Sequence, residues 1–182
     1  MRQTVVMIFL IAFFLALVPR TDAQGPAPRS GAATPLKDIG DLIVGKWTGE
    51  GTYSADYPGV GKKGEKFTST STCRWTAGQA AITCEGRENT STWTSLYWWD
   101  SGSKEIKVIG VNPGGNFDVG TIAKQGAKLV WASAGSFADG RRVEYKYEVT
   151  FQDNGNTRVE TGATILAGVR NEFREIYKRV AK

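Results

Sequence analysis

The residue types that could support chemistry gather in the last predicted strand, residues 169–180. Strand alternation puts Glu175, Tyr177 and Arg179 on one face together with Phe173. A carboxylate among such rings would have a raised pKa and could act as a general acid or base. The alternative, which we favour, is that Glu175 pairs with Arg179, or with an arginine on the neighbouring strand, as a buried structural couple.

Histidine, which many catalytic sites and zinc sites use, does not occur in this sequence. Its 182 residues contain no histidine, so they offer no Ser-His-Asp or Cys-His arrangement, no ordinary general base near neutral pH and no complete zinc-ligand set. The glycine-rich stretches lack the spacing of a phosphate-binding loop. We therefore expect a protein that is not an enzyme and that has no metal site.

The two cysteines fall in a predicted hairpin. Residues 66–77 and 80–87 read as strands around a Gly-Gln loop at 78–79, a pair suited to a type II′ turn. In that register Cys73 faces Cys84 within disulfide range. The sequence therefore predicts one disulfide bridge, in preference to a reactive thiol or a two-cysteine metal site.

The first 23 residues have the pattern of a secretory signal peptide. Arg2 precedes an unbroken apolar run, residues 5–18, and Thr21-Asp22-Ala23 supplies small residues for cleavage. These 14 apolar residues are fewer than the ~20 that span a bilayer. We expect cleavage after Ala23, export to the periplasm or the outside of the cell, and no membrane span in the mature chain.

The mature chain is expected to hold one domain of mild charge. Residues 24–35 are rich in Pro, Ala and Gly and are predicted to be a flexible linker, while residues 36–182 suit a single domain. Removing residues 1–23 takes away two arginines and one aspartate, so the formal charge falls from +5 to +4. Such a mild and interspersed balance argues against nucleic acid as the main partner.

Turn signals recur about every 8 to 12 residues between segments of alternating hydrophobicity, which is typical of an all-β protein. Residues 36–44 instead have helical spacing and are predicted to form a short helix over one end of the sheet. About ten strands in up-and-down order would leave exposed edges in an open sheet, and closure removes them. The sequence therefore predicts a single antiparallel up-and-down β-barrel of about ten strands with a short N-terminal helix.

A Gly-x-Trp-x-Gly-x-Gly pattern, residues 45–51, opens the first predicted strand. The large indole of Trp47 can plug one end of a barrel, and glycines on one face let the strand bend and a neighbouring backbone come close. The alternative is that Trp47 is an ordinary core aromatic beside turn glycines.

This opening, the helix before it, the strand count and a basic residue in the last strand together resemble the lipocalin-like, or calycin, superfamily. The longer form Gly-Lys-Trp-Thr-Gly-Glu-Gly, with Tyr57 and Pro58 downstream, is similar to the opening of nitrobindin-type haem barrels. Residues 96–100 and 175–179 are more similar to a bacterial lipocalin-like family of unknown function. The resemblance covers roughly residues 36–180.

The resemblance implies that Gly45, Trp47 and Arg179 close one end of the barrel. In calycin barrels a tyrosine and an arginine placed like Tyr177 and Arg179 can hold a ligand's carboxylate, or the arginine can pack across the indole of the opening motif. We favour the second arrangement, since closure by a cation over the indole is what the motif implies.

Nitrobindin-type barrels hold haem iron through a histidine late in the chain, and this sequence departs from that pattern because it has none. Both methionines lie in the signal segment and the cysteines are expected to be bridged, which leaves tyrosine as the only ligand type for haem. We therefore expect no haem and no other cofactor.

Two functions fit these features. The first is an exported, non-enzymatic binding protein for a small hydrophobic or amphipathic molecule, because the chain has more rings than one core needs. The rings expected to bind the ligand are Trp75, Tyr97, Trp99, Trp131, Tyr145, Tyr147, Phe173 and Tyr177. The second is a structural or protein-interaction module whose barrel is filled by its own side chains and whose Trp93, Leu96 and Trp98 are exposed. An empty, ring-lined interior would favour the first.

Overall fold

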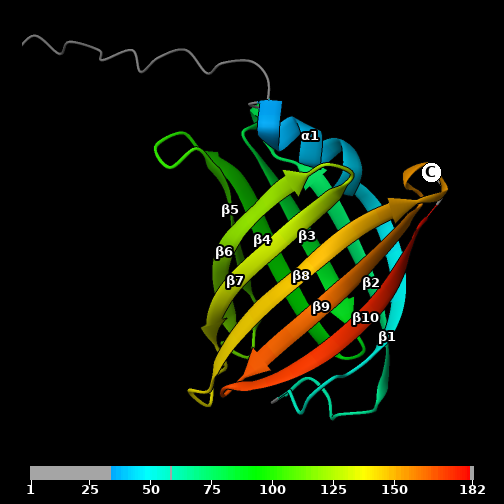
Figure 1. The fold of residues 1–182 in the computed structure, drawn as a ribbon, viewed down its shortest axis with the longest axis vertical. Coiled ribbons are helices and arrows are strands. Elements are labelled where there is room, and N and C mark those ends of the chain that lie inside the picture. Colours follow the sequence, from blue (N-terminus) through cyan, green and yellow to red (C-terminus); the bar gives the residue numbers. More distant parts are fainter. Residues whose placement is uncertain (1–33, 58, 181–182) are drawn as a thin grey trace, which may run out of the picture.

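Ten antiparallel strands form one closed barrel in the computed structural model, which describes residues 34–57 and 59–180 (Figure 1). Each strand pairs with its neighbours in the chain, and the first and last strands pair with each other to complete the cylinder. The strands are β1 (Gly45–Thr52), β2 (Lys66–Trp75), β3 (Ala81–Glu88), β4 (Ser91–Asp100), β5 (Glu105–Val111), β6 (Phe117–Gln125), β7 (Lys128–Ser136), β8 (Arg142–Gln152), β9 (Thr157–Leu166) and β10 (Val169–Arg179). The predicted architecture is confirmed.

The helix that precedes the barrel, α1 (Thr34–Ile43), lies across one end of it (Figure 1). It begins two residues earlier than predicted, inside the segment expected to be linker, because a proline is well tolerated in the first helical turn. Its buried side chains are Leu36, Ile39 and Ile43. A Cβ atom at Gly40 would lie 2.1 Å from the Trp75 ring, so the glycine lets the helix settle on that indole.

The expected signal peptide, residues 1–23, and most of the expected linker lie outside the described residues. In the part of the chain that the structure describes, no helix is both long and apolar enough to cross a bilayer.

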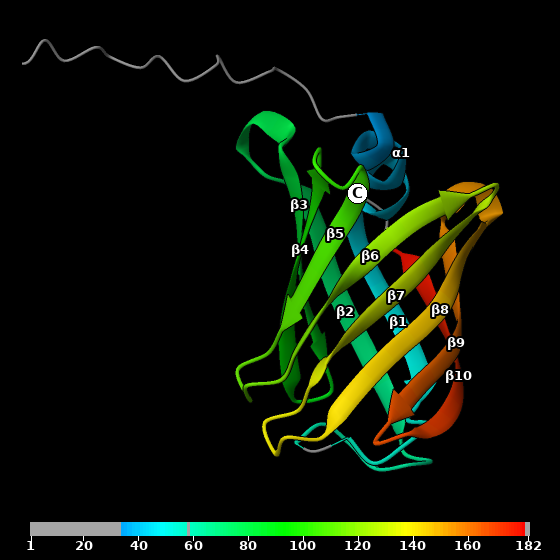
Figure 2. The same cartoon turned by 60° about the vertical axis from the view of Figure 1, so that its left-hand side comes forward.

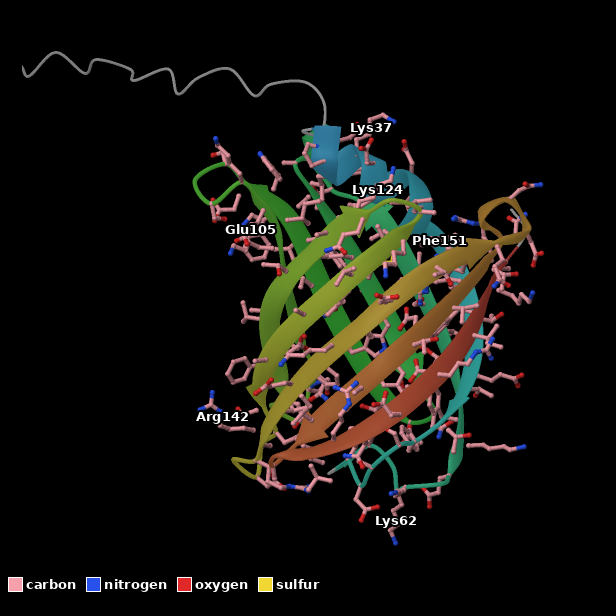
Figure 3. The ribbon with its side chains drawn as sticks, viewed as in Figure 1. Lys37, Lys62, Glu105, Lys124, Arg142 and Phe151 are labelled. Carbon is pink, nitrogen blue, oxygen red and sulfur yellow. A yellow bond between two sulfur atoms is a disulfide. The ribbon has the colours of Figure 1, made fainter. Side chains whose placement is uncertain are left out.

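The other end of the barrel is covered by the connection between β1 and β2 (Figure 2). Tyr53 and Glu65 begin and end this connection, joined by an amide-to-carbonyl hydrogen bond of 2.9 Å. Ala55 is buried there with Phe137 from the β7–β8 turn. Figure 3 shows Lys62 of this connection at the end of the molecule opposite α1.

Alternation along each strand sends one set of side chains into the barrel and the other to its outer surface. In β8, Val143 and Val149 are buried while Glu144, Lys146 and Glu148 are exposed. Because every strand keeps this period of two, the interior set can be followed from strand to strand through the register.

The β2–β3 hairpin has the predicted register but a different loop. The Thr76 amide donates to the Ala81 carbonyl at 2.9 Å, so residues 77–80 form a four-residue loop rather than a two-residue one. Gly78 and Gln79 both have positive φ, 71° and 55°. A type II′ turn has positive φ at its first central residue only, so the predicted turn type is wrong.

Candidate functional site

Trp47 closes the barrel at the α1 end. Its side chain is 1% exposed, and its Nε1 donates to the Ile43 carbonyl at 2.8 Å. The guanidinium carbons of Arg179 and Arg158 lie 4.3 and 5.1 Å from the indole centroid, within the range of cation–π attraction. The indole therefore plugs this end, as the opening motif implies.

Arg179 fastens the last strand to the helix and the first strand. It pairs with Trp47 across β1 and β10, and its Nη2 and Nη1 donate to the Leu42 and Val44 carbonyls at 2.7 and 2.5 Å. These carbonyls lie at the C-terminal end of α1, where helical partners run out and positive charge is favoured. A Cβ atom at Gly45 would lie 2.5 Å from Nη1, so closure requires glycine there. Arg179 packs across the indole rather than facing a ligand.

The predicted disulfide is present between Cys73 and Cys84, which face each other in the β2–β3 ladder. Both residues are buried in the same apolar cluster as Ile43 of α1. The bridge therefore adds a covalent link to the closed end of the barrel.

A cavity of about 310 Å³ occupies the interior. Six of the eight rings expected to bind a ligand line it: Tyr97, Trp131, Tyr145, Tyr147, Phe173 and Tyr177. Trp75 and Trp99 point inward but do not line it. Trp75 lies under Gly40 of α1, and Trp99 packs against the cluster that holds the helix, so these two are lid contacts.

Four of the lining rings form a continuous arc. Trp131 stacks on Tyr147 with a centroid distance of 5.2 Å. It also meets the Tyr97 ring edge-on, with a centroid distance of 5.6 Å. Tyr147 meets Phe173 edge-on at 5.6 Å, across Gly162, which pairs with both. Offset and edge-on pairs of this kind hold aromatic walls in fixed geometry.

Glycines on neighbouring strands make room for the large interior side chains. A Cβ atom at Gly49 would lie 2.2 Å from the Tyr177 ring, and one at Gly110 would lie 2.6 Å from Oδ1 of Asp118. Each glycine pairs with the residue that covers it. The spacing of the opening motif predicts that its glycines admit a neighbouring backbone, whereas Gly49 admits a ring.

The cavity wall also carries four carboxyl groups and one guanidinium: Glu88, Asp118, Glu160, Glu175 and Arg158. Burial raises the pKa of each of the four acids. Arg158 lies beside Glu160, with Nε 3.1 Å from Oε1, and its guanidinium also covers the Tyr177 ring at 4.2 Å. The interior is therefore acidic, although the chain as a whole has a formal charge of +5.

Glu175 does not form the arginine pair that we favoured from the sequence. Its Oε2 accepts a hydrogen bond of 2.7 Å from the Tyr177 hydroxyl, Arg179 turns to the helix, and the arginine of the neighbouring strand pairs with Glu160 instead. Glu160 lies directly opposite Glu175 in the β9–β10 ladder. Burial, reinforced by the charge of Glu160, raises the pKa of Glu175 to about 8.

Sequence reasoning missed Arg158, Glu160, Glu88 and Asp118 as interior residues. The alternation of side chains along each strand indicates the inward position of two of them. Glu88 shares a face with the buried Cys84, and Asp118 shares a face with the buried Ile122. Carboxylates are usually exposed, so a charged residue type does not by itself indicate an interior position. Within residues 34–57 and 59–180, no three potential metal-ligating groups of the His, Cys, Asp or Glu type come together.

The Trp-rich strand β4 turns Trp93 inward, so the expectation that Trp93 is exposed is wrong. Its indole lies over Gly86 of β3 and lines the cavity. Leu96, on the outer face, is 36% exposed. Other large apolar side chains exposed on the adjoining strands are Val111, Phe117 and Val119.

No protein-family model and no curated protein matches the sequence. The fold does match a solved structure, the crystal structure of Rv2717c from M. tuberculosis. The alignment covers 83% of this chain and 100% of that chain, with a TM-score of 0.59 and 13% sequence identity. At that identity the likeness shows the fold alone. The chain is a closed ten-strand antiparallel β-barrel with a counterpart of known structure.

Proposed function

We propose that this protein is an exported, lipocalin-like binding protein that holds a small amphipathic molecule inside its barrel without transforming it. The observation that carries the proposal is the ring-lined cavity of about 310 Å³, at the lower end of the ~300 to 1,000 Å³ typical of ligand pockets. A barrel filled by its own side chains would leave no such space.

The calycin assignment is supported by the closed end. The indole of the opening motif, the arginine of the last strand and the preceding helix are in mutual contact, as the resemblance implies. Export is supported by the Cys73–Cys84 bridge, because disulfides persist in oxidising compartments, and by the signal pattern of residues 1–23.

Binding without turnover is supported by the groups in the wall. The cysteines are bridged, and no histidine is present to activate a serine or threonine hydroxyl. We propose that haem is not the ligand either, because tyrosine is the only suitable side chain. Burial raises the pKa of Tyr147 and Tyr177 well above the usual value, which disfavours the phenolate that would bind iron.

The test is a fluorescence titration with Nile red, a neutral lipophilic dye. We expect its emission to rise and shift to the blue when it enters the cavity. Ser95→Phe places a ring in the cavity wall and should weaken dye binding at least tenfold. Thr94→Phe, one residue earlier on the outer face of the same strand, is the matched control and should bind normally.

Absence of any dye signal with the unmodified protein would contradict the proposal. Equal loss of binding in both variants would show that the dye does not report on the interior.

The second candidate is a protein-interaction module, favoured by the exposed apolar side chains on β4, β5 and β6. Leu96 pairs with Ile109 of β5, and Ile109 pairs with Val119 of β6, so these side chains are neighbours on the outer face. Light scattering of the unmodified chain and of Phe117→Ser tests this candidate. A monomer of unchanged mass in both would argue against self-association.

A further inference from the structure

The charges that line the cavity are unbalanced. Four carboxyl groups face one guanidinium there, and none of the ion pairs formed within the described residues includes Glu88, Asp118 or Glu175. Burying an ionised carboxyl group without a cation is costly, so such a group either gains a cationic partner or binds a proton. These carboxyl groups could therefore be stabilised by a cationic group of a bound ligand.

The cation in the cavity wall, Arg158, is partly engaged: its Nε lies 3.1 Å from the Glu160 carboxyl group, although it forms no well-aligned hydrogen bond within the described residues. Arg158 is paired with Glu160 and its guanidinium lies over both Tyr177 and Trp47, at 4.2 and 5.1 Å from the ring centroids. A ligand carboxylate would meet four carboxyl groups and compete with Glu160 for this guanidinium. The wall disfavours an anion.

A second, independent observation points to a polar ligand group in the same cavity. Tyr53 lines it and is 4% exposed, and its buried hydroxyl is near the Glu88 carboxyl group but forms no well-aligned hydrogen bond in the described part of the chain. Burial and the nearby charge of Glu88 raise the pKa of this tyrosine. A neutral hydroxyl can accept a hydrogen bond from an N–H donor.

The rings lie next to the carboxyl groups. Phe173 is two residues before Glu175 on the interior face of β10, and Gly162, over which Phe173 and Tyr147 meet, is two residues after Glu160 on β9. A bound molecule can thus place a charged end at the carboxyl pair and an apolar body against the ring arc. Aromatic faces also attract ammonium groups.

We propose that the ligand of this cavity is a small protonated amine with an aromatic or aliphatic body, its ammonium group held by Glu175 and Glu160 and its body packed against Trp131, Tyr147 and Phe173. This inference rests on the proposed binding function and names its ligand class. A bare metal ion fits less well, because the acids are spread around the wall and no three ligating groups come together among the described residues.

Amine binding should release protons. Burial raises the pKa of Glu175 to about 8, so this carboxyl group is mostly protonated at neutral pH, in surroundings that contain Glu160 and Arg158 of β9, Tyr177 of β10 and Glu88 of β3. An ammonium group beside Glu175 favours its ionised form and so expels its proton. A neutral ligand of the same shape has no such effect.

The test is isothermal titration calorimetry at pH 7 with three phenyl compounds that differ in charge: phenethylamine, 2-phenylethanol and 3-phenylpropanoate. We expect the amine to bind at least tenfold more tightly than the other two. Its binding enthalpy should change with the ionisation enthalpy of the buffer, which reports proton release.

Glu175→Gln should weaken amine binding at least tenfold and abolish most of the proton release. Glu172→Gln is the matched control, because Glu172 lies on the same strand but is exposed on the outer surface beside Arg170. Tyr53→Phe should weaken the amine a few-fold without lowering the melting temperature. Near-ultraviolet circular dichroism checks that each variant is folded.

Alcohol or propanoate binding as tightly as the amine would overturn the ligand class while leaving the binding function intact. The same conclusion follows if Nile red binds and none of the three compounds does. Failure of the dye and of all three compounds would overturn the binding function itself.

Discussion

The two halves of the barrel interior satisfy their polar groups in different ways. At the α1 end, the Trp47 indole, the Arg179 guanidinium and the helix carbonyls have partners, and a disulfide lies in the same cluster. Only the buried hydroxyl of Ser71, opposite Trp47 on β2, lacks one there among the described residues. Around the cavity, by contrast, Glu175 accepts a hydrogen bond from the Tyr177 hydroxyl but pairs with no cation. The Tyr53 hydroxyl forms no well-aligned hydrogen bond in the described residues. The closed end is thus built for stability, and the cavity keeps polar groups available at a cost in stability.

The largest effect is expected at the closed end. Trp47→Ala should lower the free energy of unfolding by about 3 to 5 kcal/mol, because it empties a fully buried site and removes two cation–π contacts. Chemical denaturation monitored by far-ultraviolet circular dichroism measures this change. Trp98→Ala, on the outer face of β4, is the control and should cost far less. Equal losses would show that the indole plug has no special role.

The disulfide should contribute less than the indole. Replacing both cysteines by alanine opens a loop with a sequence separation of 11 and should lower the free energy of unfolding by roughly 2 to 3 kcal/mol. Reduction of the unmodified protein should produce a similar shift in the denaturation midpoint. A midpoint that does not move under either treatment would contradict this expectation.

The cavity should make stability depend on pH. Because burial raises the pKa of Glu175 to about 8, its contribution is fully present below the unfolded pKa of about 4.3 and is lost as pH rises toward 8. Glu88, Asp118 and Glu160 shift in the same direction. Unfolding midpoints should therefore fall between about pH 5 and 8, with a slope of up to about 1.4 kcal/mol per pH unit for each proton released.

Glu175→Gln should flatten this pH profile and raise stability at pH 8, since it removes one buried carboxylate. A profile that keeps its slope in the variant would show that another group is responsible.

The smallest effect is expected for Tyr177→Phe. The substitution deletes one hydrogen bond to Glu175, worth about 1 kcal/mol, and keeps the ring under Arg158. Because that hydrogen bond holds the pKa of Glu175 down, its loss should move the pH transition upward. A carboxyl-specific NMR titration measures the shift. A shift to lower pH would contradict the assigned hydrogen bond.

Much of the closed end could be predicted from the sequence. The opening motif combines an indole with glycines that have few uses except close approach, and the paired cysteines follow from strand register alone. The residues that line the cavity are harder to predict from the sequence. Alternation shows which face of a strand a residue occupies, but not how far along the barrel axis it lies, so it does not separate Trp75 and Trp99, which hold the helix, from the rings that line the cavity.

Alternation along the strands indicates that the carboxyl groups of the cavity face inward, but their grouping in one cavity wall could not be predicted, for a related reason. Which carboxyl groups share one space depends on the stagger of the closed sheet, and that stagger is a property of all ten strands together. Glu160 and Glu175 face each other only because β9 and β10 pair in one particular register. Local patterns do not carry that information.

The hydrogen bonds from Arg179 to the helix carbonyls join residues 135 and 137 positions apart. During synthesis the first strand must therefore wait, with an unpaired edge, until β10 has been made. Folding that depends on such distant contacts is slow, and exposed edges invite association with other chains. A premature stop codon before position 176 would remove the β10 residues that pair with β1 and leave the barrel open, and such products should be recovered as aggregates or as targets of proteases.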